Sequence, residues 1–483
     1  MIDIMILPND ALLNIFGFFV DHKDRIEAWH PLVHVCRKWR NIVFGSPRRL
    51  NLHIRCAVDG PQALGELLDI WPDLPIVITL YEPPTSSPGV DKIVAVAAAS
   101  ESLALAHTNR VVCDISLGMY MVVTSPLQVI FAAMQVASPA SIRLKFLPEH
   151  EAVPIAAPDD PFLDGFSSSS PHLRSLYLGR VPFPGLPKPL LFATDLVRLT
   201  MHDIPPSWYI SPEAMVACLS VLTSLESLRL GFEFPRPRHV QERRRLPQQT
   251  FSALPALTHF SFRGVSEYLE DLVARIDGPF LNELCIAFFH QLVLKTPELA
   301  QFISRAPNLK AVNEVHLVFL DDAVQVLLGS MQQISILTAC KALDWQLSFV
   351  TQVCNSSLSL IIPSLEHLYI REDKTSQSRW PDDVENSQWL DILGPFTNVK
   401  NLYLSGGVVP RIAPALQELV EGRRSVAEVL PNLERLYLEE PHPGLGTFIY
   451  ARQLSEGHGP TNSRNWEGRR TSEIGKRFTG HFD

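Results

Sequence analysis

Three tyrosines near the C-terminal end recur at a fixed interval and have the chemistry of a binding surface. Tyr369, Tyr403 and Tyr437 are 34 residues apart, and each lies between two aliphatic residues of a repeated pattern. Because side chains alternate along a strand, a tyrosine between two inward residues faces outward. Three such residues in register would form a strip of rings and hydroxyls, and Tyr177 has the same local setting. We predict that these four tyrosines contact a target protein; the alternative is that tyrosine merely suits strands.

Residues that do covalent or metal chemistry show no recognisable spacing. The sequence has no phosphate-binding loop motif, no dinucleotide-binding glycine pattern, no H-E-x-x-H and no G-x-S-x-G. Its seven cysteines form no C-x-x-C pair, and its 16 histidines are scattered. We therefore expect a protein that is not an enzyme, with no catalytic residue, metal site or cofactor, and we interpret the cysteines as reduced core residues.

The elements that position the tyrosines follow one template, L-x-x-L-x-L, separated by helical patterns. The stretches that contain a copy start at residues 171, 194, 223, 255, 279, 363, 397 and 431. Between them, helices are predicted from Ser211-Pro212, from Thr296-Pro297 and around 389–396. A strand and a returning helix repeated every 23 to 34 residues indicate an α/β leucine-rich-repeat solenoid, with parallel strands on the concave face and helices outside.

The repetition is irregular, which sets the predicted boundaries. Over 307–360 the template fades, and we expect one or two degenerate units there. Residues 49–165 are predicted to be atypical early repeats that cap the solenoid, with strands in LNLHIRC, LPIVITLY and ASIRLKF and a helix in AAASESLALA. The main solenoid is placed at 166–450. The arginine-rich stretch 235–245 is predicted to be a solvated insertion rather than an acid-binding loop, and 451–483 a disordered tail.

The first 48 residues form a separate helical pattern. Leu12, Ile15, Phe16 and Phe19 fall on one helical face, and a second apolar face recurs over residues 32–43. A unit this small buries too little surface to be stable alone. Its apolar face must therefore be covered by the rest of the chain or by another protein.

This N-terminal segment resembles an F-box, the helical module by which target receptors bind the Skp adaptor of cullin-RING ubiquitin ligases. The resemblance runs through Leu7-Pro8, Leu12-Leu13, Ile15-Phe16, the run 35–40 and Ser46-Pro47, about a tenth of the chain. One departure is Trp29-His30-Pro31, where family members often carry small residues. The alternative is a helical hairpin that caps the next domain. The resemblance implies that the adaptor contacts Leu7, Pro8, Leu12, Ile15, Phe16, Val35, Cys36 and Trp39.

Composition limits the remaining function classes. The chain has 483 residues, is 46% apolar and carries a formal net charge of −9, which argues against a general nucleic-acid binder. No apolar run approaches the roughly 18 residues of a membrane span, and no signal peptide is evident, so we expect an intracellular protein of the cytoplasm or nucleus.

The whole chain resembles the F-box and leucine-rich-repeat proteins abundant in mushroom-forming fungi. The resemblance implies a substrate receptor of a ubiquitin ligase, with a Skp-type adaptor, a cullin behind it and an unknown protein substrate as partners, and with neither nucleic acid nor membrane. The alternative is a leucine-rich-repeat scaffold that belongs to no ligase.

Overall fold

The chain divides into two compact units, and each is described by itself. In the computed structural model, unit 1 comprises Met1–Phe234 with Ser252–Ala256, and unit 2 comprises Pro235–Phe251 with Leu257–Asp483. The structure describes residues 7–21, 29–45, 54–57, 76–81, 112–119, 141–146, 173–180, 193–206, 209–235, 251–291, 293–372, 384–420, 429–439 and 445. The predicted divisions at residues 48, 165 and 450 remain predictions.

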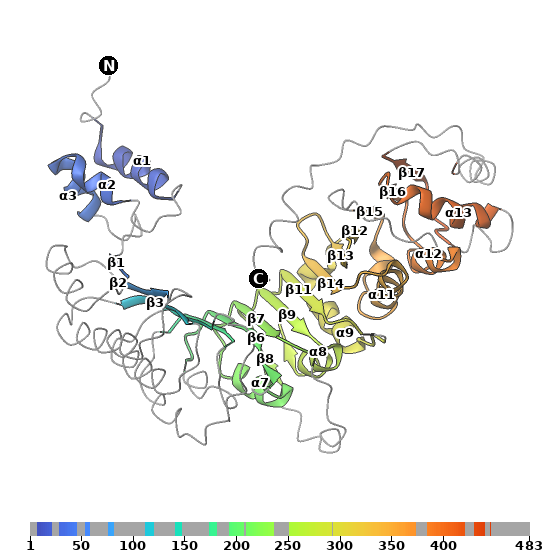
Figure 1. Cartoon of the computed structure of the whole chain (residues 1–483), viewed down its shortest axis with the longest axis horizontal. Coiled ribbons are helices and arrows are strands. Elements are labelled where there is room, and N and C mark those ends of the chain that lie inside the picture. The colour runs from blue at the N-terminus through green and yellow to red at the C-terminus, as the bar shows by residue number, and fades with distance from the viewer. Residues whose placement is uncertain are drawn as a thin grey trace. The chain divides into compact units, whose positions relative to one another are not determined.

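Unit 1 contains a parallel sheet in which each strand pairs with the next one along the chain (Figure 1). Three of its early strands overlap the predicted segments, whereas β3 was not predicted, because its sequence VCDISLGM lacks the leucine template. The strands of this sheet are β1 (Ile54–Ala57), β2 (Ile76–Tyr81), β3 (Val112–Met119), β4 (Ser141–Phe146), β5 (Ser175–Gly179), β6 (Arg198–Ile204) and β7 (Ser227–Phe232). The two-residue β8 (Ser252–Ala253) is not part of it.

Two helices of unit 1 begin where the sequence supplies a capping residue or a proline. In α7 (Pro212–Leu219) the Ser211 hydroxyl accepts a hydrogen bond from the backbone N–H of Ala214, and Pro212 occupies the first turn. The N-terminal segment folds into α1 (Asn9–Asp21), α2 (His30–Val35) and α3 (Arg37–Gly45). Proline again lies in the first turn of α2.

Unit 2 also alternates strands with helices. Its strands are β9 (His259–Gly264), β10 (Ile276–Asp277), β11 (Glu283–Phe288), β12 (Glu314–Phe319), β13 (Ala323–Leu328), β14 (Ile334–Ala339), β15 (His367–Glu372), β16 (Asn401–Leu404) and β17 (Arg435–Leu438). Its helices are α8 (Ser266–Val273), α9 (Pro297–Arg305), α10 (Pro307–Lys310), α11 (Leu343–Asn355), the 3-10 turn η6 (Ile362–Ser364), α12 (Asn386–Leu393) and α13 (Val409–Val420).

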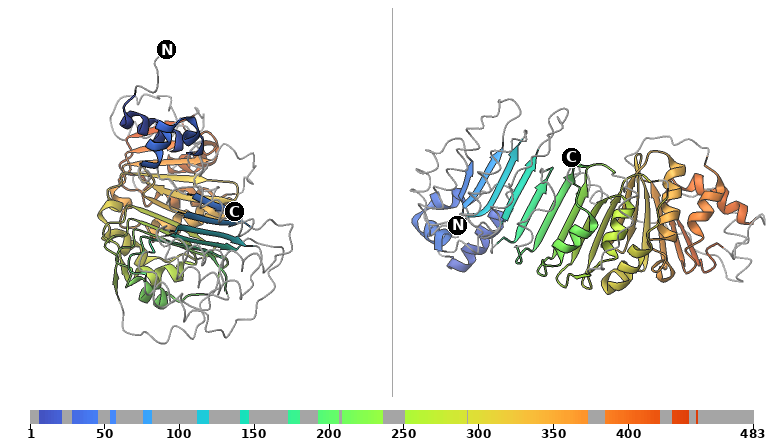
Figure 2. Two further views of the ribbon diagram at one scale, coloured as in Figure 1. Left: turned by 90° about the vertical axis from the view of Figure 1, so that its left-hand side faces the viewer. Right: turned by 90° about the horizontal axis from the view of Figure 1, so that it is seen from below.

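The core of unit 2 lies between the sheet and these helices. Inward residues of the strands, such as Leu402 and Leu404, are at most 2% exposed, while Tyr403 between them is half-buried. Trp389, on the facing side of α12, is also buried. Helices α8, α9, α11, α12 and α13 follow the strands along one side, which leaves the other side of the sheet open (Figures 1 and 2). The predicted α/β leucine-rich-repeat-like solenoid is confirmed.

The region 307–360 departs from simple repetition. Strand β13 runs antiparallel to both of its neighbours, so that the strand order is β9-β11-β14-β13-β12-β15-β16-β17. All six β13 residues are buried, and the Gln325 amide donates to the Ser335 hydroxyl at 3.0 Å. The reversal uses Gly329 at φ 80° and Gln332 at φ 56°. The mostly apolar sequence of β13 does not alternate apolar with polar residues, so the sequence alone did not predict the reversed strand.

Several predictions fall outside the described residues. The expected helix in 97–106, most of the arginine-rich stretch 235–245 and the tail 451–483 belong to this group. They stay predictions.

Candidate functional site

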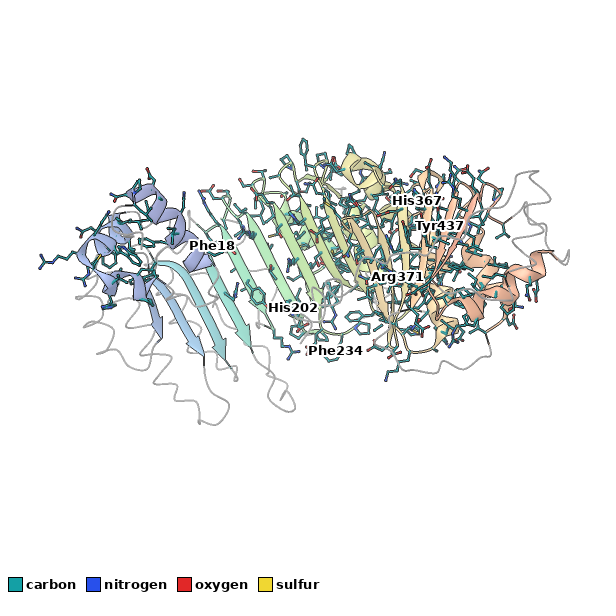
Figure 3. The ribbon with its side chains drawn as sticks, turned by 90° about the horizontal axis from the view of Figure 1, so that it is seen from above. Phe18, His202, Phe234, His367, Arg371 and Tyr437 are labelled. Atoms are coloured by element: carbon teal, nitrogen blue, oxygen red, sulfur yellow. The ribbon has the colours of Figure 1, made fainter. Side chains whose placement is uncertain are left out.

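A row of four stacked rings lies on the open side of the unit 2 sheet. The ring centroids of Tyr369 and Tyr403 are 4.2 Å apart with planes 8° apart, and those of Tyr403 and Tyr437 are 4.4 Å apart with planes 6° apart. His316 extends the row, with its ring centroid 4.3 Å from that of Tyr369 and a plane angle of 9°. We call these four residues the ring row. Figure 3 labels Tyr437 at one end.

The strand register explains why the rings stack. His316 of β12 pairs with Tyr369 of β15, which pairs with Tyr403 of β16, which pairs with Tyr437 of β17. Neighbouring strands lie about 4.8 Å apart, so identical outward positions place flat side chains at almost van der Waals separation. The predicted alignment of the three tyrosines is confirmed by this register.

Stacking decides which atoms the ring row presents. The faces of Tyr369 and Tyr403 are covered on both sides by neighbouring rings, so a ligand meets ring edges and hydroxyl groups instead of ring faces. The Tyr403 hydroxyl is close enough to those of Tyr369 and Tyr437 for them to influence its ionisation. Burial raises the pKa of Tyr369 and of Tyr403, so both phenols stay protonated and able to donate. The row suits hydrogen bonding to a peptide more than stacking of a flat cofactor.

His316 is the member of the row that sequence reasoning missed. Burial, and next the charge of Arg371, lower the pKa of His316 to about 3, so its ring is neutral. The Arg371 guanidinium donates to His316 Nδ1 at 3.0 Å, and His316 Nε2 lies 3.7 Å from a Glu314 carboxylate oxygen. The alternation of apolar and polar residues in β12 could have revealed its outward position, because His316 lies between Val315 and Leu317, which are both buried.

A polar row flanks the ring row on the same side of the sheet. Glu314 pairs with His367, which pairs with Asn401, which pairs with Arg435. The rings of His367 and Tyr403 are 6.2 Å apart. Side chains of His367 and Arg371 both come from β15 (Figure 3). Aromatic edges beside a polar row resemble the mixture found in protein interfaces, where a desolvated centre has a polar rim.

Tyr177 lies in unit 1 and has different neighbours. It pairs with Arg143 of β4 and with Thr200 of β6, and the Arg143 guanidinium carbon is 5.5 Å from its ring centroid. The register therefore gives Tyr177 no aromatic neighbour on either adjacent strand. Its role in target binding stays a prediction.

The N-terminal helices have their own small core. Leu12, Phe16 and Val43 are fully buried, and the Phe16 and Trp39 rings are 4.7 Å apart. The Lys38 ammonium donates to the Leu7 carbonyl at 3.2 Å, which ties the start of α1 to α3. Two of the predicted contact residues, Leu12 and Phe16, are thus inside the module.

Other predicted contact residues remain at the module's surface. Ile15 is 45% exposed, Val35 is 58% exposed and Pro8 is also exposed; Leu7, Cys36 and Trp39 are half-buried. Phe18, which was not predicted as a contact, is 67% exposed (Figure 3). Trp29, part of the departure from the F-box pattern, is buried with its ring 6.0 Å from that of Phe44.

Among the described residues there is no group of three or more His, Cys, Asp or Glu that could hold a metal ion. In the same residues, no helix has the length and apolar character needed to cross a membrane.

Comparison with known proteins shows a distant likeness among solved structures. No protein-family model matches the sequence, and neither does any curated protein. Among solved structures, the chain is similar to LegL7, a leucine-rich-repeat-containing protein from Legionella pneumophila. The identity is 13%, the match covers 80% of this chain and 99% of that one, and the TM-score is 0.28. With so low a TM-score, the assignment of function rests on the chain's own surfaces.

Proposed function

We propose that this chain is a non-catalytic target receptor of a Skp-cullin-F-box ubiquitin ligase. The N-terminal helices would bind the Skp-type adaptor, and the open side of the repeat sheet would hold the target protein. The chain's contribution to catalysis is then proximity, because holding two reactants together removes much of the entropic cost of their reaction. On this proposal the ligase's other subunits supply the chemistry.

The observation that carries the docking half of the proposal is the exposed apolar surface of a very small module. Ile15, Phe18 and Val35 are each 45% exposed or more, although the module's own core is filled by Phe16 and Leu12. Side chains of this kind gain free energy when a partner removes them from water. The F-box resemblance of the same segment supplies the identity of that partner.

The ring row supports the target-binding half. Tyrosine is enriched among the residues that dominate interface energies, and stacked rings lose little further freedom when a partner binds. The hydroxyl groups along the row can pair with backbone or side-chain groups of a protein segment.

A repeat scaffold outside any ligase remains the second candidate. It needs only the ring row, and in it the N-terminal helices would serve folding alone. Phe16 is buried within the module, against Trp39, as this alternative expects. The surface residues of the module therefore distinguish the two candidates.

The experiment measures binding of a purified Skp-type adaptor to the full chain. The variant Ile15→Asp with Val35→Asp places charges on the module surface. A hot-spot loss of about 2 kcal/mol or more corresponds to roughly thirtyfold weaker binding. The control carries Val293→Asp and Leu360→Asp, whose side chains are 60% and 59% exposed in unit 2, and should bind normally. Adaptor binding that is absent from the wild type, or equal in variant and control, would reject the docking role.

A further inference from the structure

The open side of the unit 1 sheet carries a second row of a different chemical kind. In register across β4, β5, β6 and β7 lie Arg143, Tyr177, Thr200 and Arg229. The residues before and after them in β5, β6 and β7 are buried, so the row itself faces outward. Two arginines thus flank two hydroxyl side chains.

The exposed charges at the outward positions of β5 to β7 are positive. Arg143, Arg198 and Arg229 are exposed, and Arg198 precedes Thr200 by two residues, which places it on the same side of β6. The outward positions of β5 to β7 contain no carboxylate: they are Ser175, Tyr177, Gly179, Arg198, Thr200, His202, Ser227, Arg229 and Gly231. Figure 3 labels His202 on this sheet.

The nearest carboxylate at the end of these strands is already engaged. An Asp203 carboxylate oxygen lies 3.3 Å from the Arg180 guanidinium and 3.0 Å from His202 Nδ1. By contrast, Arg143, Arg198 and Arg229 make no ion pair with any residue that the structure describes. In unit 2, by comparison, the Lys400 ammonium lies 2.7 Å from a Glu366 carboxylate oxygen. Three arginines on one sheet surface thus have no described counter-charge, although the chain as a whole has a net charge of −9.

The two arginines at the ends of the row act on the same hydroxyl. Burial raises the pKa of Tyr177, and the charges of Arg143 and Arg229 oppose that rise while Asp203 adds to it. Both guanidinium groups therefore lie near enough to Tyr177 for their fields to overlap there. A negative group placed above Tyr177 and Thr200 would gain from both charges and from two hydroxyl donors.

We propose that this row, named here the arginine row, binds an acidic segment of a partner protein in extended conformation. The inference rests on the proposed target-binding role of the open sheet and names a chemical class of target. Three strand spacings of about 4.8 Å separate β4 from β7, or about 14 Å. An extended peptide rises about 3.3 Å per residue, so carboxylates at positions i and i+4 span about 13 Å on one side of the peptide. Two glutamates or aspartates in that spacing match Arg143 and Arg229.

Protein is favoured over nucleic acid as the occupant. Binding of single-stranded nucleic acid uses aromatic faces on which bases stack, and Arg143 already lies over the Tyr177 ring. The net negative charge of the chain also repels nucleic acid, which carries one charge per nucleotide, more strongly than it repels a peptide with a few carboxylates.

The test uses a fluorescein-labelled oligo-glutamate peptide of about ten residues, with anisotropy as the readout at low salt. The variant is Arg143→Gln with Arg229→Gln in the full chain. The control is Lys310→Gln with Lys341→Gln, which removes the same charge from exposed positions of unit 2. Since an exposed ion pair contributes up to about 1 kcal/mol, we expect about tenfold weaker binding in the variant and unchanged binding in the control. Circular dichroism confirms that both fold.

Three results would overturn the inference: equal binding by variant and wild type, an equal loss in the control, or stronger binding of an oligothymidylate of similar length. A third protein, in which Tyr369, Tyr403 and Tyr437 are replaced by alanine, separates the two proposals. It should keep the peptide affinity of the wild type. If this protein keeps the peptide affinity and also keeps all cellular partners, the target-binding role of the ring row is refuted while the arginine row is supported. If this protein loses peptide binding, the arginine row is refuted as the peptide site.

Discussion

The substitution Leu404→Ala tests the packing that positions the ring row. Leu404 is 2% exposed and lies in register with Ile370 on β15 and Leu438 on β17. Truncating a fully buried leucine removes its transfer free energy and leaves a cavity, which together cost about 2 to 5 kcal/mol. Ile370, at 1% exposed, cannot fill the space without a shift of its strand. We expect the upper half of this range.

Two further leucines make this prediction quantitative. Leu438 occupies the same template position but is half-buried on β17, the last strand in the sheet order, so Leu438→Ala should cost roughly 1 to 2 kcal/mol. Leu360 is 59% exposed, and Leu360→Ala should change the free energy of unfolding by less than about 0.5 kcal/mol. The three variants differ only in where the same side chain is removed.

The assay is urea unfolding followed by far-UV circular dichroism, with midpoints compared at a constant m-value. The expected order of destabilisation is Leu404→Ala, then Leu438→Ala, then Leu360→Ala. Equal midpoints for Leu404→Ala and Leu360→Ala would show that the strand register behind the ring row is wrong.

Three other predictions concern single groups. Burial raises the pKa of Glu270 from 4.5 to about 7, although the backbone N–H groups of Glu298 and Leu299 donate hydrogen bonds that lower it. Because the folded state binds this proton more tightly than the unfolded state, the stability of the wild type relative to Glu270→Gln should fall as pH rises from 4.5 to about 7. A difference in urea midpoint that stays constant over this range would contradict the prediction. Gly329→Ala should destabilise the fold by about 1 kcal/mol or more in urea unfolding, because φ of Gly329 is 80° and a Cβ there would meet the Gln333 side chain. The control is Gly394→Ala, whose Cβ would make only ordinary contacts. Equal destabilisation by the two substitutions would contradict the left-handed backbone conformation at Gly329. Tyr403→Phe removes the central hydroxyl of the ring row, so partner binding should weaken while the free energy of unfolding changes by less than about 1 kcal/mol. Unchanged binding would show that this hydroxyl contributes nothing to recognition.

Local pattern predicted most of what positions the ring row. The template residues around Tyr403 and Tyr437 require alternate burial, and equal spacing of 34 residues implies equal strand positions. Pro297 and Ser211 likewise marked helix starts that the structure contains. Each of these features depends on a few neighbouring residues, so a single sequence suffices to find it.

Features that depend on tertiary pairing were missed. His316 lies 53 residues before Tyr369 in the sequence. It joins the ring row only because the antiparallel strand β13 leaves β12 paired with β15. The AVQVLL run of β13 has no alternation from which that reversal could be inferred. For the same reason the arginine row was not predicted: Arg143 and Arg229 belong to different repeats, and only the register brings them into one line.

Affinity purification with quantitative mass spectrometry tests the proposed receptor role most directly. The baits are the wild-type chain, the Ile15→Asp and Val35→Asp variant, and the triple alanine variant of the tyrosines. We predict that a Skp-type adaptor and a cullin accompany the wild type and the tyrosine variant but not the module variant. The remaining partners should accompany the wild type and the module variant but not the tyrosine variant. A wild-type bait without adaptor, or three baits with one shared partner list, would contradict the proposed function.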